Sequence, residues 1–198
     1  MNNIVNLRAF TTARGVPIVV FVDMQKEYLA APRLFAIPNI EPAVENCRKV
    51  LVHSRKVGLP IVFVRWLEQS APFFNKATPF VGWIEGFEPQ RNEMIFERKR
   101  PSCYTSDGFA ELMHQGGADV VIAGFAGEAA CLSTMVDAFH RNHRMTFLTD
   151  ASASHSLGEM TAENVHSTVS KIAGLYGEVA KTDAWLDTVR QIDEVVSD

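Results

Sequence analysis

The side chains with the clearest chemical potential in this sequence are a carboxylate, an amine and a thiol that each follow a short apolar run. They are Asp23, Lys99 and Cys131. A thiol beside an ammonium group and at the start of a helix is a better nucleophile, because both positive partners lower its pKa. A nearby carboxylate can accept the thiol proton and later return it to a leaving amine. These three residues therefore predict acyl transfer through a thioester.

The segment around the thiol, GFAGEAACLSTMVDA at 124–138, leaves a strand and enters a helix. Small residues at 126, 127, 129 and 130 remove bulk from around Cys131. The unpaired N–H groups of a helix start favour the thiolate and can hold the oxyanion of a tetrahedral intermediate. The segment thus predicts a nucleophile turn.

Each of the three residues also has a plain structural interpretation. Asp23 can cap the following turn, Lys99 lies in the charged run ERKRP, and Cys131 can be a small core residue. Their joint placement after three separate strands favours the catalytic interpretation, because parallel strands bring their carboxyl ends to one edge of a sheet.

Strand-length apolar runs alternate with amphipathic helical stretches along the whole chain. We expect strands at 16–23, 59–66, 93–99, 118–125, 144–150 and 177–182, and helices at 39–58, 106–117, 131–142, 160–176 and from 183. Strands buried on both faces and joined by helices predict an α/β fold, a doubly wound parallel sheet with helices on both faces. The aromatic-rich connection at 67–92 is long enough to be a lid or an oligomer contact.

Composition excludes several other classes of protein. The 198 residues, 47% of them hydrophobic and without a break in composition, predict a single domain over 1–198 with its core at about 15–185. A net charge of -4 with dispersed basic residues argues against nucleic acid as a partner. No apolar run approaches the roughly 18 residues of a membrane span, so we expect a cytoplasmic protein. The three cysteines have no metal-type pairing and predict reduced thiols.

Three stretches together resemble the isochorismatase-like cysteine hydrolase superfamily, which includes nicotinamidase, N-carbamoylsarcosine amidohydrolase and ureidoacrylate hydrolase. They are VVFVDMQKEYL, ERKRPSCYTSDGFAEL and VVIAGFAGEAACLSTMVDAFHRNHRMTFLTDAS. The resemblance implies hydrolysis of a C–N bond in a small amide, ureido or carbamoyl substrate through a covalent acyl-enzyme. It implies Asp23, Lys99 and Cys131 as the catalytic residues.

The resemblance also implies details of the nucleophile turn. A cis peptide is expected at Ala126–Gly127, and the backbone N–H groups of Gly127 and Cys131 are expected to form an oxyanion hole. The six residues between Gly124 and Cys131 are one more than relatives generally have, so the turn is expected to carry an extra residue. The family pattern K..YSAF is replaced here by KRPSCYTSDGF.

No cofactor and no metal are expected, because the stretch RWLEQSAPFFNKATPF lacks the histidines of the nicotinamidase metal site. His140 and His143 have a spacing that can bind metal, but a helix-end position explains them more simply. His155 and His166 flank a loop-to-helix turn from which either can reach the strand-end cleft, but surface or cap roles are favoured.

Several further residues are expected to contact the substrate. The arginines at 65, 98 and 100 are candidates for holding a substrate carboxylate, with a solvated role favoured for the last two. Cys103 lines the pocket or is structural, and Cys47 belongs to the core. The predicted substrate-binding residues are Gln25, Tyr28, Trp66, Phe74, Tyr104, Ala126 and Glu128.

Two other functions fit parts of the sequence. One is vinyl ether hydrolysis as in isochorismatase itself, which the presence of Cys131 argues against. The other is a non-catalytic oligomeric module in which Cys131 and Cys103 sense oxidants. The aromatic residues of the long connection also predict a homo-oligomer, a dimer or a tetramer.

Overall fold

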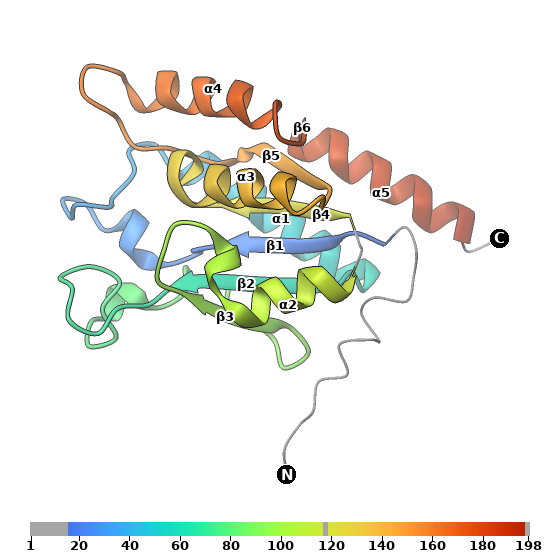
Figure 1. Cartoon of the computed structure of the whole chain (residues 1–198), viewed down its shortest axis with the longest axis horizontal. Coiled ribbons are helices and arrows are strands. Elements are labelled where there is room, and N and C mark those ends of the chain that lie inside the picture. Colours follow the sequence, from blue (N-terminus) through green and yellow to red (C-terminus); the bar gives the residue numbers. More distant parts are fainter. Residues whose placement is uncertain (1–15, 117–118, 197–198) are drawn as a thin grey trace, which may run out of the picture.

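A single sheet of six parallel strands forms the centre of the molecule (Figure 1). The computed structural model describes residues 16–116 and 119–196, with side chains described over 16–115 and 119–189. The strand order is β3-β2-β1-β4-β5-β6, which is the doubly wound parallel sheet predicted from the sequence. The strands are β1 (Ile18–Val22), β2 (Ile61–Trp66), β3 (Met94–Arg98), β4 (Val120–Gly124), β5 (Met145–Ser152) and β6 (Glu178–Ala180).

Helices cover both faces of this sheet and create two hydrophobic cores (Figure 1). Residues of α1 and α5 pack with one face, while residues of α2, α3 and α4 pack with the other. Alternate residues of β1 enter the two cores, because successive side chains of a strand point to opposite faces. The helices are α1 (Glu41–Val57), α2 (Asp107–Gly116), α3 (Leu132–His140), α4 (Ala162–Ala173) and α5 (Thr182–Val196).

The long connection between β2 and β3 packs on the protein's own core. Phe74 and Phe87 are fully buried there, and Phe73 and Trp83 pack against the same core. A short 3-10 turn, Pro79–Val81, lies within it. Much of its aromatic content thus stabilises this chain rather than standing free for a partner.

A glycine at the end of β4 brings that strand close to β1. Gly124 has a φ of 116°, a conformation that side chains disfavour, and a Cβ there would lie 2.0 Å from the carbonyl oxygen of Val22. The close approach places the turn after β4 beside Asp23, which follows β1 directly. The carboxyl ends of β1 and β4, which lead to Asp23 and to the turn before Cys131, therefore lie side by side.

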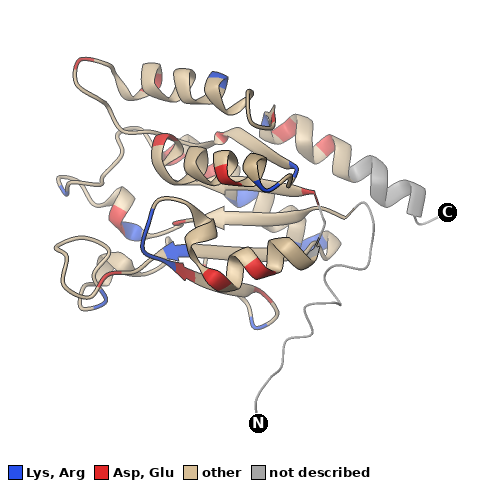
Figure 2. Ribbon diagram, viewed as in Figure 1, with Lys and Arg blue, Asp and Glu red and all other residues tan. Residues whose placement is uncertain are grey.

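Charged residues are scattered over the elements of the fold (Figure 2). The exception is a consecutive basic stretch, residues 98–100, at the end of β3. Among the helices that the structure describes, none is long and apolar enough to cross a bilayer.

Candidate active site

Asp23 lies at the carboxyl end of β1 and is fully buried. Its φ of 48° is in the left-handed region, which aspartate tolerates better than most residues. Tyr28 donates a hydrogen bond to its Oδ2 at 3.1 Å, and Arg98 donates a second to the same oxygen. No donor among the described residues contacts Oδ1. Burial raises the pKa of Asp23, and Arg98 and Tyr28 offset part of that rise.

The cation beside Asp23 is Arg98, and the prediction that Lys99 occupies this place is wrong. Arg98 is only 1% exposed, whereas Lys99 lies on the surface. The Arg98 guanidinium also donates to the carbonyl oxygen of Arg100 and stacks over the ring of Trp66 at 4.8 Å. Its solvated interpretation is therefore wrong as well, since it is a buried ion-pair partner.

One signal in the sequence and one in the structure point to Arg98. In the pattern K..YSAF the lysine stands four positions before the serine, and the residue four positions before Ser102 is Arg98. The burial pattern of β3 also alternates, so that Met94 and Arg98 are buried while Glu97 is exposed. Lys99, the next residue, is exposed, as this alternation predicts.

Cys131 ends a π-helical turn, Gly127–Cys131, that leads into α3. The Cys131 N–H donates to the carbonyl oxygen of Ala126, five residues earlier. A π-helical turn holds one residue more than an α-helical turn. The turn therefore accommodates the extra residue expected between Gly124 and Cys131. The cis peptide is Phe125–Ala126, one position before the expected Ala126–Gly127.

The sulfur of Cys131 is fully buried, and the pKa of its thiol is raised, whereas a lowered pKa was expected. Burial raises its pKa well above the ordinary value, and the nearby Cys103 and Asp23 raise it further. The expected lowering required an ammonium group beside the thiol, but Lys99 is on the surface. Cys131 in this form is a neutral thiol that needs a base.

The two backbone N–H groups that are expected to form the oxyanion hole have acceptors within the protein. The Gly127 N–H donates to the carbonyl oxygen of Ala153 at 2.8 Å, and the Cys131 N–H donates to that of Ala126 at 3.2 Å. Both predicted donors are thus engaged in this form. The Ala126 N–H has no acceptor among the described residues, although Ala126 is only 2% exposed. It is the better candidate donor to an oxyanion.

Most of the predicted substrate contacts are used within the protein. Both amide N–H groups of Gln25 donate to backbone carbonyls, those of Trp66 and Val81. Trp66 stacks parallel to Phe74, with ring centres 5.4 Å apart. The hydroxyl of Tyr104 hydrogen-bonds to His143 Nδ1 at 2.7 Å.

Glu128 and His155 form a second ion pair close to Tyr28. His155 Nδ1 lies 2.6 Å from Glu128 Oε1, and His155 Nε2 lies 3.1 Å from the carbonyl oxygen of Phe35. Both partners are acceptors, so both bonds form only when the ring carries two protons. Burial lowers the pKa of His155, but these acceptors outweigh it and the net shift is upward. His155, whose side chain is 20% exposed, therefore links its own segment to those of Glu128 and Phe35.

The remaining cysteines lie near the same strand ends. Cys103 is fully buried; burial raises its pKa to about 12, and Arg98 opposes the rise. Its N–H donates to Thr134, one turn along the helix from Cys131. Cys47 is buried in the core, as predicted, and its thiol donates to the carbonyl oxygen of Ala151.

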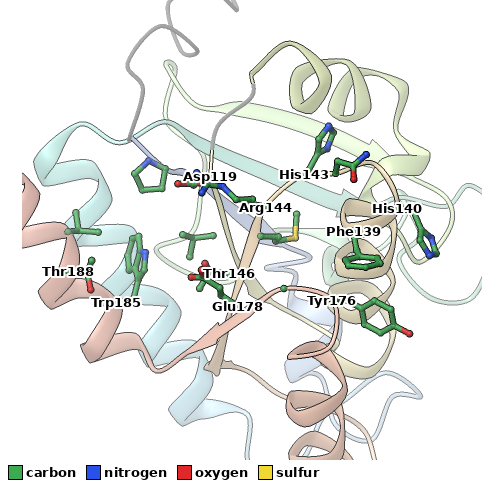
Figure 3. A pocket seen from close by; sticks show the side chains of 16 residues that line it. Asp119, Phe139, His140, His143, Arg144, Thr146, Tyr176, Glu178, Trp185 and Thr188 are labelled. Carbon is green, nitrogen blue, oxygen red and sulfur yellow. The ribbon is translucent and has the colours of Figure 1, made fainter.

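A cavity of about 730 Å³ lies at the amino ends of β4, β5 and β6, at the edge of the sheet opposite Cys131 (Figure 3). His140, His143, Tyr176 and Trp185 line it, with the ion-paired Asp119. No cysteine or serine is among its described lining residues. The nucleophile chemistry therefore belongs to the carboxyl edge.

Ser152, at the end of β5, donates a hydrogen bond to Cys131 Sγ at 3.9 Å. Such a donor favours the thiolate and lowers the pKa of the thiol. We expect Ser152→Ala to lower the thiolate fraction of Cys131 about 3- to 10-fold at a fixed pH below the thiol pKa, since a hydrogen bond to a charged group contributes about 1 kcal/mol or more. The effect is measured as a displacement of the pH profile of alkylation by iodoacetamide, not as a change in its limiting rate. The rate of both proteins should rise with pH, with the variant's profile displaced to higher pH.

Peptide mapping should assign the modified cysteine, and Ser154→Ala is the matched control. Superimposable pH profiles for Ser152→Ala and the parent protein would show that the hydroxyl does not act on the sulfur.

Comparisons with known proteins agree with this architecture. Residues 17–183 match the model of the isochorismatase domain. An uncharacterized isochorismatase family protein, YddQ from Bacillus subtilis (strain 168), is 27% identical over 173 residues, covering 83% of this chain and 96% of the relative. An isochorismatase from Pseudomonas putida KT2440 has a TM-score of 0.79 at 27% identity, covering 87% of this chain and 91% of that one. A cysteine hydrolase from Pseudomonas syringae pv. phaseolicola 1448A shares the fold, with a TM-score of 0.80 at 20% identity, over 89% and 93% of the two chains.

Proposed function

Because this chain belongs to the isochorismatase family, we propose that it is a cysteine hydrolase that cleaves the C–N bond of a small amide or ureido substrate. The observation that carries the proposal is the buried carboxylate of Asp23. Arg98 and Tyr28 hold one of its oxygens, no donor among the described residues lies within hydrogen-bonding distance of the other, and its charge acts on Cys131. A neutral thiol and a fixed base with one open oxygen are the two groups that such a reaction needs.

In the first half of the reaction, Asp23 accepts the proton of Cys131 while the sulfur attacks the substrate carbonyl carbon. The C–S bond forms, and the carbonyl electron pair moves to oxygen, where the Ala126 N–H can donate to it. The oxyanion then collapses and the C–N bond breaks. Asp23 returns its proton to the leaving nitrogen, which departs as ammonia or an amine.

In the second half, water attacks the thioester carbon. Asp23 takes a proton from the water, the C–S bond breaks, and the electron pair returns to sulfur. The same proton then restores the thiol. Arg98 takes no part in proton transfer, because a guanidinium does not deprotonate in proteins. It holds Asp23 in the ionised form and in a fixed orientation, a task that the resemblance assigned to a lysine.

The test is to trap the intermediate. The protein is mixed with primary amides and N-carbamoyl compounds, and the reaction is quenched in acid. The mass of the intact protein is then measured by mass spectrometry. We expect one added acyl mass at Cys131 for a true substrate, and no such mass in Cys131→Ala. Hydrolysis that persists undiminished in Cys131→Ala, without any adduct in the parent protein, would refute the thioester mechanism.

A further inference from the structure

A surface loop, residues 30–36, follows the 3-10 turn Lys26–Leu29 and leads toward α1; we call it the strap. Its described backbone hydrogen bonds are local turns. Leu34 in its middle is 77% exposed. Near its start, Arg33 is ion-paired with Glu27 of the 3-10 turn at 2.6 Å. The strap can therefore move without breaking a strand or a helix.

The strap lies over aromatic rings that contact the buried ion pair. Phe35, which is half-buried, packs on the fully buried Phe74, with ring centres 5.1 Å apart. Tyr28 packs on Phe74 at 5.3 Å and donates its hydrogen bond to Asp23. Trp66 also stacks on Phe74, and the guanidinium that pairs with Asp23 lies over the Trp66 ring. In this form the strap therefore closes the site on that side.

One side chain joins the end of the strap to the nucleophile turn. His155 Nε2 lies 3.1 Å from the carbonyl oxygen of Phe35, and His155 Nδ1 lies 2.6 Å from Glu128 Oε1. Glu128 belongs to the π-helical turn that ends at Cys131. Both nitrogens thus face acceptors, so the ring makes both hydrogen bonds only when it carries two protons.

A neutral ring has one N–H group and keeps only one of these bonds. A carboxylate is a stronger acceptor than a backbone carbonyl, so the remaining proton stays on Nδ1, facing Glu128. The lone pair of Nε2 then faces the carbonyl oxygen of Phe35, and the two repel each other. Loss of one proton from His155 therefore releases the strap while the contact with Glu128 remains.

The groups that face the His155 ring leave one charged partner. Glu128 faces it from the π-helical turn, Phe35 from the strap, and Tyr28 from the 3-10 turn, with ring centres 6.1 Å apart. Burial raises the pKa of Glu128, but the hydrogen bond from His155 outweighs it and the net shift is downward, so Glu128 is ionised. Burial and the charge of Asp23 raise the pKa of Tyr28 well above its usual range, so its hydroxyl is neutral.

We propose that His155 controls the strap: the ring holds it closed when it carries two protons and releases it when it carries one. The proposal rests on the proposed function, because it assigns a regulation to that same site. Since the net shift in the pKa of His155 is upward from its ordinary value of 6.5, the ring holds the strap at pH 6 and releases it as the pH rises. The site then opens in the same direction of pH in which a thiolate forms.

Alkylation of the buried Cys131 by iodoacetamide measures this opening, because the reagent meets the sulfur only in an open form. The rate of each variant is divided by the parental rate at the same pH, so that the titration of the thiol cancels. We expect His155→Ala to react at least about tenfold faster than the parent protein at pH 6, and within about threefold of it at pH 9. Mass spectrometry identifies the modified peptide. His140→Ala, at an exposed position in α3, is the matched control and should react at the parental rate at both pH values.

Glu128→Gln tests the proton itself, because the two side chains have nearly the same shape. The new amide can donate to His155 Nδ1, so a neutral ring keeps its N–H on Nε2 and holds the Phe35 carbonyl at high pH as well. We expect this variant to react at least about fivefold more slowly than the parent protein at pH 9, and about equally at pH 6. Removal of a negative charge near a thiol favours the thiolate, so that effect alone would speed the reaction.

Circular dichroism checks the fold of each variant, and Glu128→Gln carries the test alone if His155→Ala does not fold. The proposal is overturned by a ratio for His155→Ala that is the same at both pH values, or by parental reactivity of Glu128→Gln at pH 9. Absence of any label on Cys131 in His155→Ala would overturn it as well, since the released strap would then not lead to the sulfur.

The two proposals fail in different ways. If the alkylation ratios change with pH as expected but no amide is hydrolysed or trapped, the control by His155 stands and the proposed function falls. If amides are hydrolysed through an adduct at Cys131 while the ratios do not change with pH, the control falls and the function stands.

Discussion

Replacement of Cys131 by alanine is expected to reduce amide hydrolysis by at least about 10³-fold while the protein stays folded. No other described thiol can take over, because Cys47 donates to Ala151 in the core and Cys103 is held at Thr134. Cys131→Ser should be nearly as inactive. The site already raises the pKa of a thiol well above its usual range, and a hydroxyl is a far weaker acid.

Steady-state assays check this expectation with the substrate that the trapping experiment identifies, and thermal unfolding checks the fold. We expect the free energy of unfolding to fall by only about 1 kcal/mol, since the side chain is small. Retention of more than a tenth of the activity in Cys131→Ala would mean that another group attacks the substrate.

The fold could be predicted from the sequence because the patterns that indicate its strands and helices are local. Each strand is a short apolar run, and each helix repeats apolar residues along one face, as in α1 with Val44, Cys47 and Leu51 buried. Parallel pairing then follows from the helical crossovers. The placement of Asp23 and the nucleophile turn at one edge is a consequence of that topology.

The composition of the site was harder to predict because it depends on single-residue register and on burial. Residues 98 and 99 are both basic, and the alternation of β3 decides which one is buried. The pKa of Cys131 depends on how completely the surrounding chain excludes water. The residues next to a cysteine in the sequence do not indicate how completely water is excluded from it.

The role of Gln25 shows a second limit. Its position two residues after Asp23 suggested a cleft-lining amide, but its partners are backbone groups of Trp66 and Val81, far away in the sequence. Those partners are fixed by the path of the connection after β2, which no local pattern encodes. Long-range hydrogen bonds of this kind turn an apparent ligand contact into a structural one.

Arg98→Met is expected to remove both activity and much of the stability, because it leaves the Asp23 carboxylate buried without a counter-ion. Breaking a buried ion pair on one side typically costs about 3–5 kcal/mol. The pKa of Asp23, already raised by burial, should rise further without Arg98. A carboxyl group whose pKa is higher in the folded protein than in the unfolded one destabilises the fold as pH increases. The loss in the free energy of unfolding should therefore be larger at pH 8 than at pH 5.

Urea denaturation at the two pH values measures this difference, and Lys99→Met is the matched control at the next position of the chain, just after β3. Because Lys99 is exposed, its replacement should change stability by less than about 0.5 kcal/mol and leave hydrolysis unchanged. Arg98→Lys should recover part of the activity, with the acid limb of its pH profile closer to that of the parent protein than in Arg98→Met. Equal effects of the two methionine variants would show that Arg98 does not hold the base, and the assignment of Asp23 as proton acceptor would lose its support.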